Sequence, residues 1–95
     1  MINSKTIDIV KNKKLESSFE PSMKTLSRIM KSIIDNGPEA KTSLSLDANI
    51  QYTRLTKHIV WLEKKGLVES AIVESHVKVG LTEKGKEFAT TLFNE

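Results

Sequence analysis

Residues 41–85 narrow the possible folds of this chain most strongly. Segments whose apolar residues recur with a helical period are followed there, without a gap, by segments typical of strands. A short helical pattern at 42–48 leads through a turn at Ala48-Asn49 into a longer helical pattern at 51–65. Two β-prone runs come directly after Gly66. This order predicts a mainly α fold with a small β-hairpin, an α+β arrangement.

The longer helical pattern, residues 51–65, is the best defined of these segments. Its apolar side chains recur at steps of three and four and predict one buried face, formed by Leu55, Ile59 and Leu62. Tyr52 falls at the margin of that face and is expected to be a core or interface residue, with a base-stacking platform as the alternative. Asn49 precedes the helix and is the expected turn residue, because Asn tolerates the left-handed conformation.

Two further helices are expected on either side of this stretch. An amphipathic pattern covers residues 22–36, with Ser22 as the N-cap and Asn36-Gly37-Pro38 as the stop. Its expected buried face is formed by Met23, Leu26, Ile29, Met30, Ile33 and Ile34. A last helix covers residues 83–93, with Thr82 as its N-cap. Gly85 in its first turn predicts close packing against the strands, because glycine carries no side chain.

The two β-prone runs, residues 67–73 and 76–81, are short enough to be the arms of one hairpin with Glu74-Ser75 at its tip. Val77, Val79 and Leu81 alternate with polar residues or glycine, which is the period of a half-buried strand. The hairpin is therefore expected to cover the helices with one face.

The length of 95 residues bounds the chain to one small domain. We expect a winged domain over residues 21–95, preceded at 1–20 by an N-terminal arm or an extra edge element. The absence of Cys excludes disulfides and thiolate metal sites, and no other metal or cofactor site is indicated. No apolar run approaches the roughly 18 to 20 residues that span a bilayer, so a cytoplasmic protein without membrane contact is expected.

The charge is distributed unevenly along the chain. Residues 41–66 carry five basic and two acidic side chains, whereas residues 67–95 carry three and five. The basic surplus therefore lies on the two central helices and the N-terminal part, which points to an acidic partner there and not at the hairpin.

Two strings in this order, Lys65-Gly66-Leu67-Val68 and Leu81-Thr82-Glu83-Lys84-Gly85, resemble the small archaeal winged helix-turn-helix DNA-binding proteins. More distantly they are similar to the multiple-antibiotic-resistance and phenolic-acid-decarboxylase types of winged regulators. The chain departs from the archaeal pattern at Gln51, where a Ser or Thr is frequent and caps better. It also lacks the long C-terminal coiled coil that some of these proteins have.

The resemblance implies that the third helix enters the major groove of double-stranded DNA. The expected base-reading residues lie on its outer face: Gln51, Thr53, Arg54 and Lys57. The expected phosphate contacts are Lys41, Thr42, Thr56 and Lys64. An ordinary solvated helix face is the alternative for the four residues expected to read bases. His76 and Lys78 are the expected wing contacts, on a wing that Glu69 and Glu74 make electrostatically weak.

A homodimer is the expected state, because winged regulators commonly bind DNA as symmetric pairs. Its interface is expected to use residues 2–10 and the apolar residues Trp61, Phe88, Leu92 and Phe93. Trp61 lies beside Val60 on the helix face expected to be exposed to solvent, which suggests a dimer contact or, alternatively, shelter under the N-terminal arm.

An enzyme is not expected, because the chain has two His, no Cys, no phosphate loop and no paired carboxylates at useful spacing. His58 is interpreted as a packing residue. The sequence favours a transcriptional regulator that reads DNA sequence. A winged protein-protein adaptor and a non-specific, chromatin-like DNA binder remain alternatives, and no small-molecule effector is indicated.

Overall fold

The computed structural model describes residues 19–93, which form four helices and one antiparallel hairpin. The elements follow in the order α2 (Met23–Asn36), α3 (Lys41–Ala48), α4 (Tyr52–Lys64), β1 (Val68–Val73), β2 (His76–Leu81) and α5 (Glu83–Phe93). This is the mainly α, α+β arrangement predicted from the sequence. Within residues 19–93, no helix is long and apolar enough to cross a membrane.

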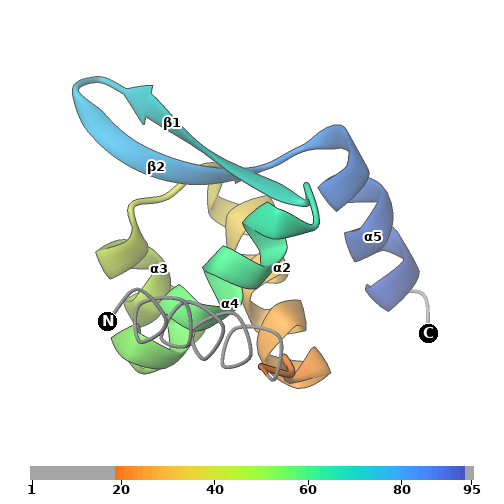
Figure 1. Cartoon of the computed structure of the whole chain (residues 1–95). Coiled ribbons are helices and arrows are strands. Elements are labelled where there is room, and N and C mark those ends of the chain that lie inside the picture. The colour runs from red at the N-terminus through yellow and green to blue at the C-terminus, as the bar shows by residue number, and fades with distance from the viewer. Residues whose placement is uncertain (1–18, 94–95) are drawn as a thin grey trace, which may run out of the picture.

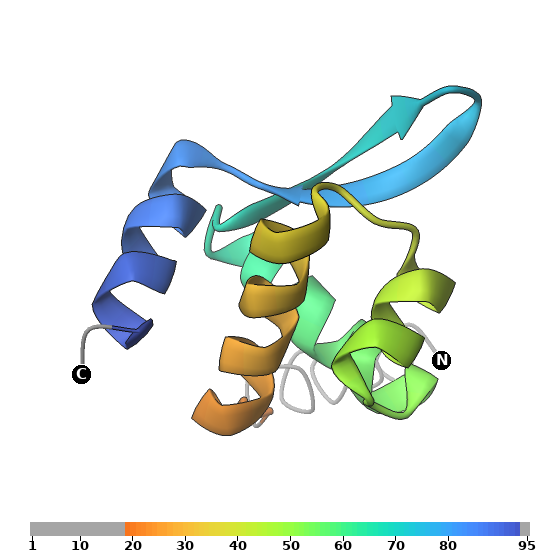
Figure 2. The same ribbon diagram turned by 180° about the vertical axis from the view of Figure 1, so that it is seen from behind.

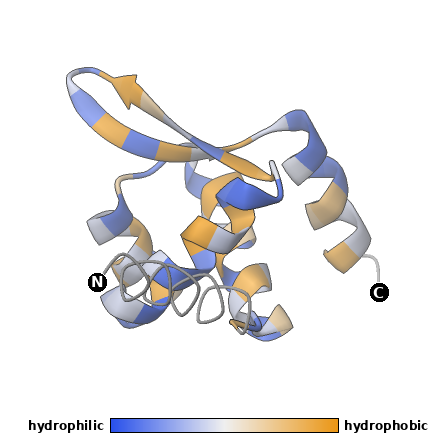
Figure 3. Cartoon of the chain, viewed as in Figure 1, coloured by the Kyte–Doolittle hydropathy of each residue, from blue (hydrophilic) through white to orange (hydrophobic). Residues whose placement is uncertain are grey.

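Helix α2 stands at the centre of the molecule. It lies between α5 on one side and the α3–α4 pair on the other, and the hairpin crosses one end of the helices (Figures 1 and 2). Hydrophobic and hydrophilic segments alternate along the helices and along β2 (Figure 3). The largest fully buried side chains are Leu26, Ile29, Met30, Leu44, Leu55, Ile59, Leu62 and Val79.

The helix boundaries follow the local signals in the sequence. The Ser22 hydroxyl accepts a hydrogen bond from the Thr25 backbone N–H at 3.2 Å and caps α2. The Thr82 hydroxyl accepts from the Gly85 N–H at 3.0 Å at the start of α5. Asn49 takes the predicted left-handed conformation between α3 and α4, with φ of 56°. Gln51 makes no side-chain capping bond to α4, as its poor capping ability predicts.

The hairpin has its tip at Glu74 and Ser75, where the sequence places it. Both residues have positive φ, 52° and 68°, which matches the twist of a two-residue hairpin turn. At the other end of the hairpin, Glu39 forms an isolated bridge with Val79 through two backbone hydrogen bonds of 2.7 and 3.0 Å. This bridge fixes the hairpin to the α2–α3 connection.

The apolar stripe of α2 is rotated relative to the sequence prediction. Met23 and Ile34 were expected on the buried face, but each is about half exposed, while Thr25 and Ser32 are buried. The two hydroxyls are buried because each has a partner on another element, Arg54 for Thr25 and Glu39 for Ser32. The predicted arm or edge element at 1–20 lies outside the described residues, apart from Phe19 and Glu20.

Candidate nucleic-acid interface

The first half of α4 gathers exposed polar side chains on its outer face. The four residues predicted to read bases are all exposed and all line one surface pocket of about 310 Å³: Gln51, Thr53, Arg54 and Lys57. Phe19, Glu20 and Ser22 close the other side of this pocket. The helix therefore presents a cationic, hydrogen-bonding surface beside the segment that enters α2.

Arg54 is tied to α2 through a contact that sequence reasoning missed. Its Nη2 donates a hydrogen bond to the Thr25 hydroxyl at 3.3 Å. Thr25 is buried, and its backbone N–H is already engaged by the Ser22 cap. The acceptor is therefore fixed, and it restrains the guanidinium on the outer side of α4.

His58 joins the start of α2 to the body of α4. The side chain is only 3% exposed, as expected for a packing residue. Its Nε2 accepts the Ser22 backbone N–H at 3.1 Å, so Nδ1 carries the proton and donates to the Arg54 carbonyl at 2.8 Å. The ring of Phe19 packs edge-on against the imidazole at 5.1 Å between centroids. One neutral imidazole thus holds the segment leading into α2 against the helix that carries Arg54.

The residues predicted to contact phosphates lie on α3 and α4 in different environments. Lys41 is half-buried at the first position of α3, and Thr42 is exposed beside it. No side chain caps this helix start, so backbone N–H groups of its first turn face outward. Lys64 is exposed at the end of α4. The Thr56 hydroxyl donates a hydrogen bond to the Thr53 carbonyl oxygen at 2.8 Å, so the hydroxyl proton of Thr56 is already engaged.

The expected wing contacts, His76 and Lys78, lie on β2 close to two glutamates in the sequence. His76 is exposed and its Nδ1 lies 2.9 Å from the Glu74 carbonyl oxygen. Lys78 is half-buried, while Glu69 and Glu74 are exposed. Nearby carboxylates reduce the positive potential of the hairpin, so a phosphate gains little there.

Among the predicted dimer residues, the three on α5 keep an accessible surface. Phe88 and Leu92 are partly buried against the core, and Phe93 is 45% exposed. Trp61 on α4 is partly buried against the core, and the Lys65 ammonium lies 5.5 Å from its ring centroid. The indole is large enough to reach the core from the flank of α4. Tyr52, at the first position of α4, is 48% exposed and is therefore not a core residue.

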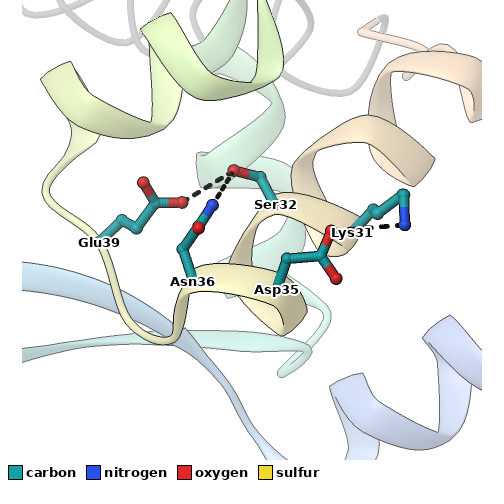
Figure 4. Close-up of polar contacts among 5 residues, drawn as sticks. All are labelled: Lys31, Ser32, Asp35, Asn36 and Glu39. Carbon is teal, nitrogen blue, oxygen red and sulfur yellow. Dashed lines mark hydrogen bonds and ion pairs between the residues drawn. The ribbon is translucent and has the colours of Figure 1, made fainter.

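A buried carboxyl group, that of Glu39, lies where the chain passes from α2 to α3. Glu39 accepts a hydrogen bond from the Ser32 hydroxyl at 2.8 Å, and the Asn36 amide donates to the same hydroxyl at 3.4 Å (Figure 4). Burial raises the pKa of Glu39 above its ordinary value of 4.5, and a hydrogen bond to the Asp47 carboxyl raises it further. Sequence analysis assigned Glu39 no role, because its partners become neighbours only in the folded chain.

Replacing Glu39 with Gln is expected to stabilise the domain at neutral and higher pH. A raised pKa in the folded state means that Glu39 contributes its full stability below pH 4.5 and loses it as the pH rises through the folded pKa. The amide keeps an acceptor for Ser32 and a donor for Asp47 without ionising. We expect a gain of up to about 1 kcal/mol at pH 8 and less at pH 4, measured by urea unfolding.

The matched control for this substitution is Asp35→Asn. Asp35 forms an exposed ion pair with Lys31 at 3.3 Å (Figure 4). Exposed pairs contribute roughly 0 to 1 kcal/mol, so this variant should follow the wild type at each pH to within about 0.5 kcal/mol. A Glu39→Gln variant that is less stable than the wild type at pH 8 would contradict the assignment of a buried, destabilised carboxylate.

Comparison with solved structures places this architecture among the winged helices. A MarR family transcriptional regulator from Silicibacter pomeroyi DSS-3 is 24% identical, with a TM-score of 0.65 over 75% of this chain and 52% of that one. The transcriptional regulator Tm0710 from Thermotoga maritima is 19% identical, with a TM-score of 0.66 over 74% and 51%. The protein F-93 of SSV1 is 22% identical, with a TM-score of 0.66 over 81% and 87%.

These similarities define the fold, and the chain spans about half the length of the MarR family regulators. No curated protein sequence matches the chain significantly. The model of the winged helix-turn-helix family matches residues 22–94. The chain belongs to the winged helix-turn-helix family. Helices α3 and α4, with the turn between them, form the helix-turn-helix, and the β1–β2 hairpin is the wing.

Proposed function

We propose that the chain binds double-stranded DNA in a sequence-dependent manner and acts as a transcriptional regulator. The observation that carries the proposal is the outer face of α4, where Gln51, Thr53, Arg54 and Lys57 are exposed together around one pocket. A winged protein-protein adaptor would be expected to present an apolar or acidic recognition helix. The similarity of the fold to regulators of the MarR family supports the same function.

In the proposed complex the N-terminal half of α4 enters the major groove. Arg54 is placed to donate two hydrogen bonds to guanine, and Gln51 to pair with adenine. Thr53 offers a hydroxyl or its methyl group to a thymine. Lys57, one turn after Thr53, extends the same face. These contacts carry the base preference, because the major groove distinguishes all four base pairs.

Phosphate contacts position the domain on the duplex and add affinity for every sequence. Lys41, Thr42 and the free N–H groups of the first turn of α3 provide one such contact. Lys64 provides another at the far end of α4, and Thr56 contributes through its oxygen. His76 and Lys78 add at most a weak contact from the wing.

A homodimer built through α5 would double this interface by two-fold symmetry. Phe93 is 45% exposed beside the partly buried Phe88 and Leu92, so the end of α5 offers an apolar surface. Trp61, which is partly buried on α4, stays a proposed contact of this dimer. A protein that sediments as a monomer at micromolar concentration would exclude the dimer without excluding DNA binding.

The proposed function is tested by selection of DNA from a random duplex library at two salt concentrations. An enriched motif in the retained DNA supports a site-specific regulator, and a palindromic motif supports the dimer as well. Retention at low salt without enrichment would instead identify a non-specific, chromatin-like binder. Absence of retention at low salt would overturn DNA binding and favour the protein adaptor.

A further inference from the structure

The end of α2 carries the dipeptide Asn36-Gly37. Among the asparagines of this sequence, Asn36 is the one that glycine follows. Gly37 ends α2 with a φ of 78°, a conformation that favours glycine, so the helix stop explains this residue. The same stop does not require an asparagine before the glycine. The side-chain amide of Asn36 therefore has no explanation in the helix stop itself.

We propose that Asn36 is a site of spontaneous deamidation, at which the Gly37 backbone nitrogen attacks the side-chain amide carbon of Asn36. The attacking nitrogen loses its proton and forms a bond to Cγ. The bond from Cγ to Nδ2 breaks, and ammonia leaves. Water then opens the cyclic succinimide at either carbonyl group, which gives aspartate or isoaspartate. The net reaction takes up water and releases ammonia, mole for mole, and needs no oxidant or reductant.

The residue after each asparagine decides how easily its nitrogen can attack. Gly37 has no Cβ beside the attacking nitrogen, and Asn36 is exposed, so water reaches its amide. Asn49 is exposed as well, but Ile50 follows it, and a stiff β-branched side chain hinders the corresponding attack. Of these two exposed asparagines, Asn36 is therefore the reactive one.

The folded end of α2 protects Asn36, because both reacting groups are engaged in other bonds. The Gly37 N–H donates a hydrogen bond to the Ile33 carbonyl oxygen at 2.7 Å. The Asn36 side-chain amide donates to the Ser32 hydroxyl at 3.4 Å (Figure 4). The Gly37 nitrogen must lose the proton that it shares with Ile33 before it can attack. The reaction therefore requires that the end of α2 opens first.

The product of the reaction would disturb the buried polar cluster beside it. The Ser32 hydroxyl, which accepts from the Asn36 amide, donates to Glu39 at 2.8 Å. Burial raises the pKa of Glu39, and a hydrogen bond from the Asn36 amide acts against that rise. A carboxylate at position 36 would instead repel the Glu39 carboxylate. Glu39 also holds β2 through two backbone bonds to Val79, so deamidation would weaken the attachment of the hairpin.

The effect of the product is measured with Asn36→Asp, and Asn36→Ala is the matched control. Both variants lose the amide donor, but only Asn36→Asp adds a carboxylate near Glu39. At neutral pH, we expect the urea midpoint of Asn36→Asp to lie about 0.5 M below that of Asn36→Ala. The difference should disappear at acid pH, where the carboxyl groups are protonated. Equal midpoints at neutral pH would overturn the predicted effect on the Glu39 cluster.

The reaction itself is tested on the full chain by incubation in mildly alkaline buffer, with and without concentrated urea, followed by peptide mass spectrometry. Trypsin cleaves after lysine and arginine, so Asn36 is recovered in the peptide 32–41 and Asn49 in the peptide 42–54. Peptide 32–41 should gain the mass of an NH2-to-OH exchange at least about tenfold faster in urea than in buffer, because urea opens the end of α2. Peptide 42–54 should stay largely unmodified at Asn49 and is the internal control.

Asn36→Gln keeps an amide at this position and completes the comparison. Its longer side chain would have to close a larger ring, so peptide 32–41 of this variant should stay unmodified in urea. A wild-type rate at Asn36 that does not exceed the rate at Asn49, or the rate in Asn36→Gln, would overturn the site. Equal wild-type rates with and without urea would overturn the protection by the folded helix end. Neither result depends on whether the chain binds DNA.

Discussion

Replacing Gly85 with alanine is expected to lower the free energy of unfolding by roughly 3 kcal/mol or more. A Cβ atom at this position would lie 2.9 Å from the carbonyl carbon of Leu67 and 3.4 Å from its Cα, and would overlap the carbonyl oxygen. That oxygen also accepts the Thr82 N–H at 3.1 Å. The obstacle is backbone held by a hydrogen bond, so no side-chain rotation relieves the overlap.

The measurement is urea unfolding of Gly85→Ala, with Lys84→Ala as the control. It separates the effect of the close contact at Leu67 from the effect of helix propensity. Alanine is favoured over glycine in a helix by up to about 1 kcal/mol, so propensity alone predicts a more stable variant. The expected loss has the opposite sign. Lys84 is exposed on the neighbouring position of α5, and its replacement should change stability by less than about 0.5 kcal/mol. A Gly85→Ala protein as stable as the wild type would show that α5 does not approach Leu67 this closely.

Much of the fold follows from signals that act over a few residues. The caps at Ser22 and Thr82, the left-handed Asn49 and the tip at Glu74-Ser75 lie where the sequence predicts them. Each depends on a hydrogen bond or a backbone preference within a single turn, which a sequence displays directly. The buried face of α4 is also as predicted, because its side chains have a clear helical period.

The features that the sequence did not predict depend on contacts between distant segments. Thr25 and Ser32 are polar residues that a helical pattern assigns to solvent, yet both are buried because Arg54 and Glu39 reach them. The Ser22–His58 bond joins residues 36 positions apart. Contacts between residues this far apart in the chain produce no repeating pattern in the sequence. They bear on the candidate site because two of them position α4 against α2.

Arg54→Ala is expected to lower the affinity for a preferred DNA site by about 1 to 3 kcal/mol and to relax the base preference. The reason is the loss of two hydrogen bonds to a base edge together with one cation. Lys41→Ala should instead weaken binding to all sequences alike. It should also flatten the plot of log affinity against log salt concentration by the amount that corresponds to about one phosphate contact. Binding isotherms on a preferred and a scrambled duplex, each at several salt concentrations, distinguish the two. Identical behaviour of the two variants would contradict the division into reading and positioning residues.

Thr25→Val makes the same test more specific, because it leaves Arg54 and every charge in place. Valine matches the shape of threonine but cannot accept the 3.3 Å hydrogen bond from the guanidinium. If that bond orients Arg54, the variant should lose part of its preference between the two duplexes while its salt slope stays that of the wild type. The preference should fall by less than in Arg54→Ala, because the guanidinium is still present. An unchanged preference would mean that Arg54 finds its base without help from α2, and that the Thr25 contact serves only the packing of the two helices.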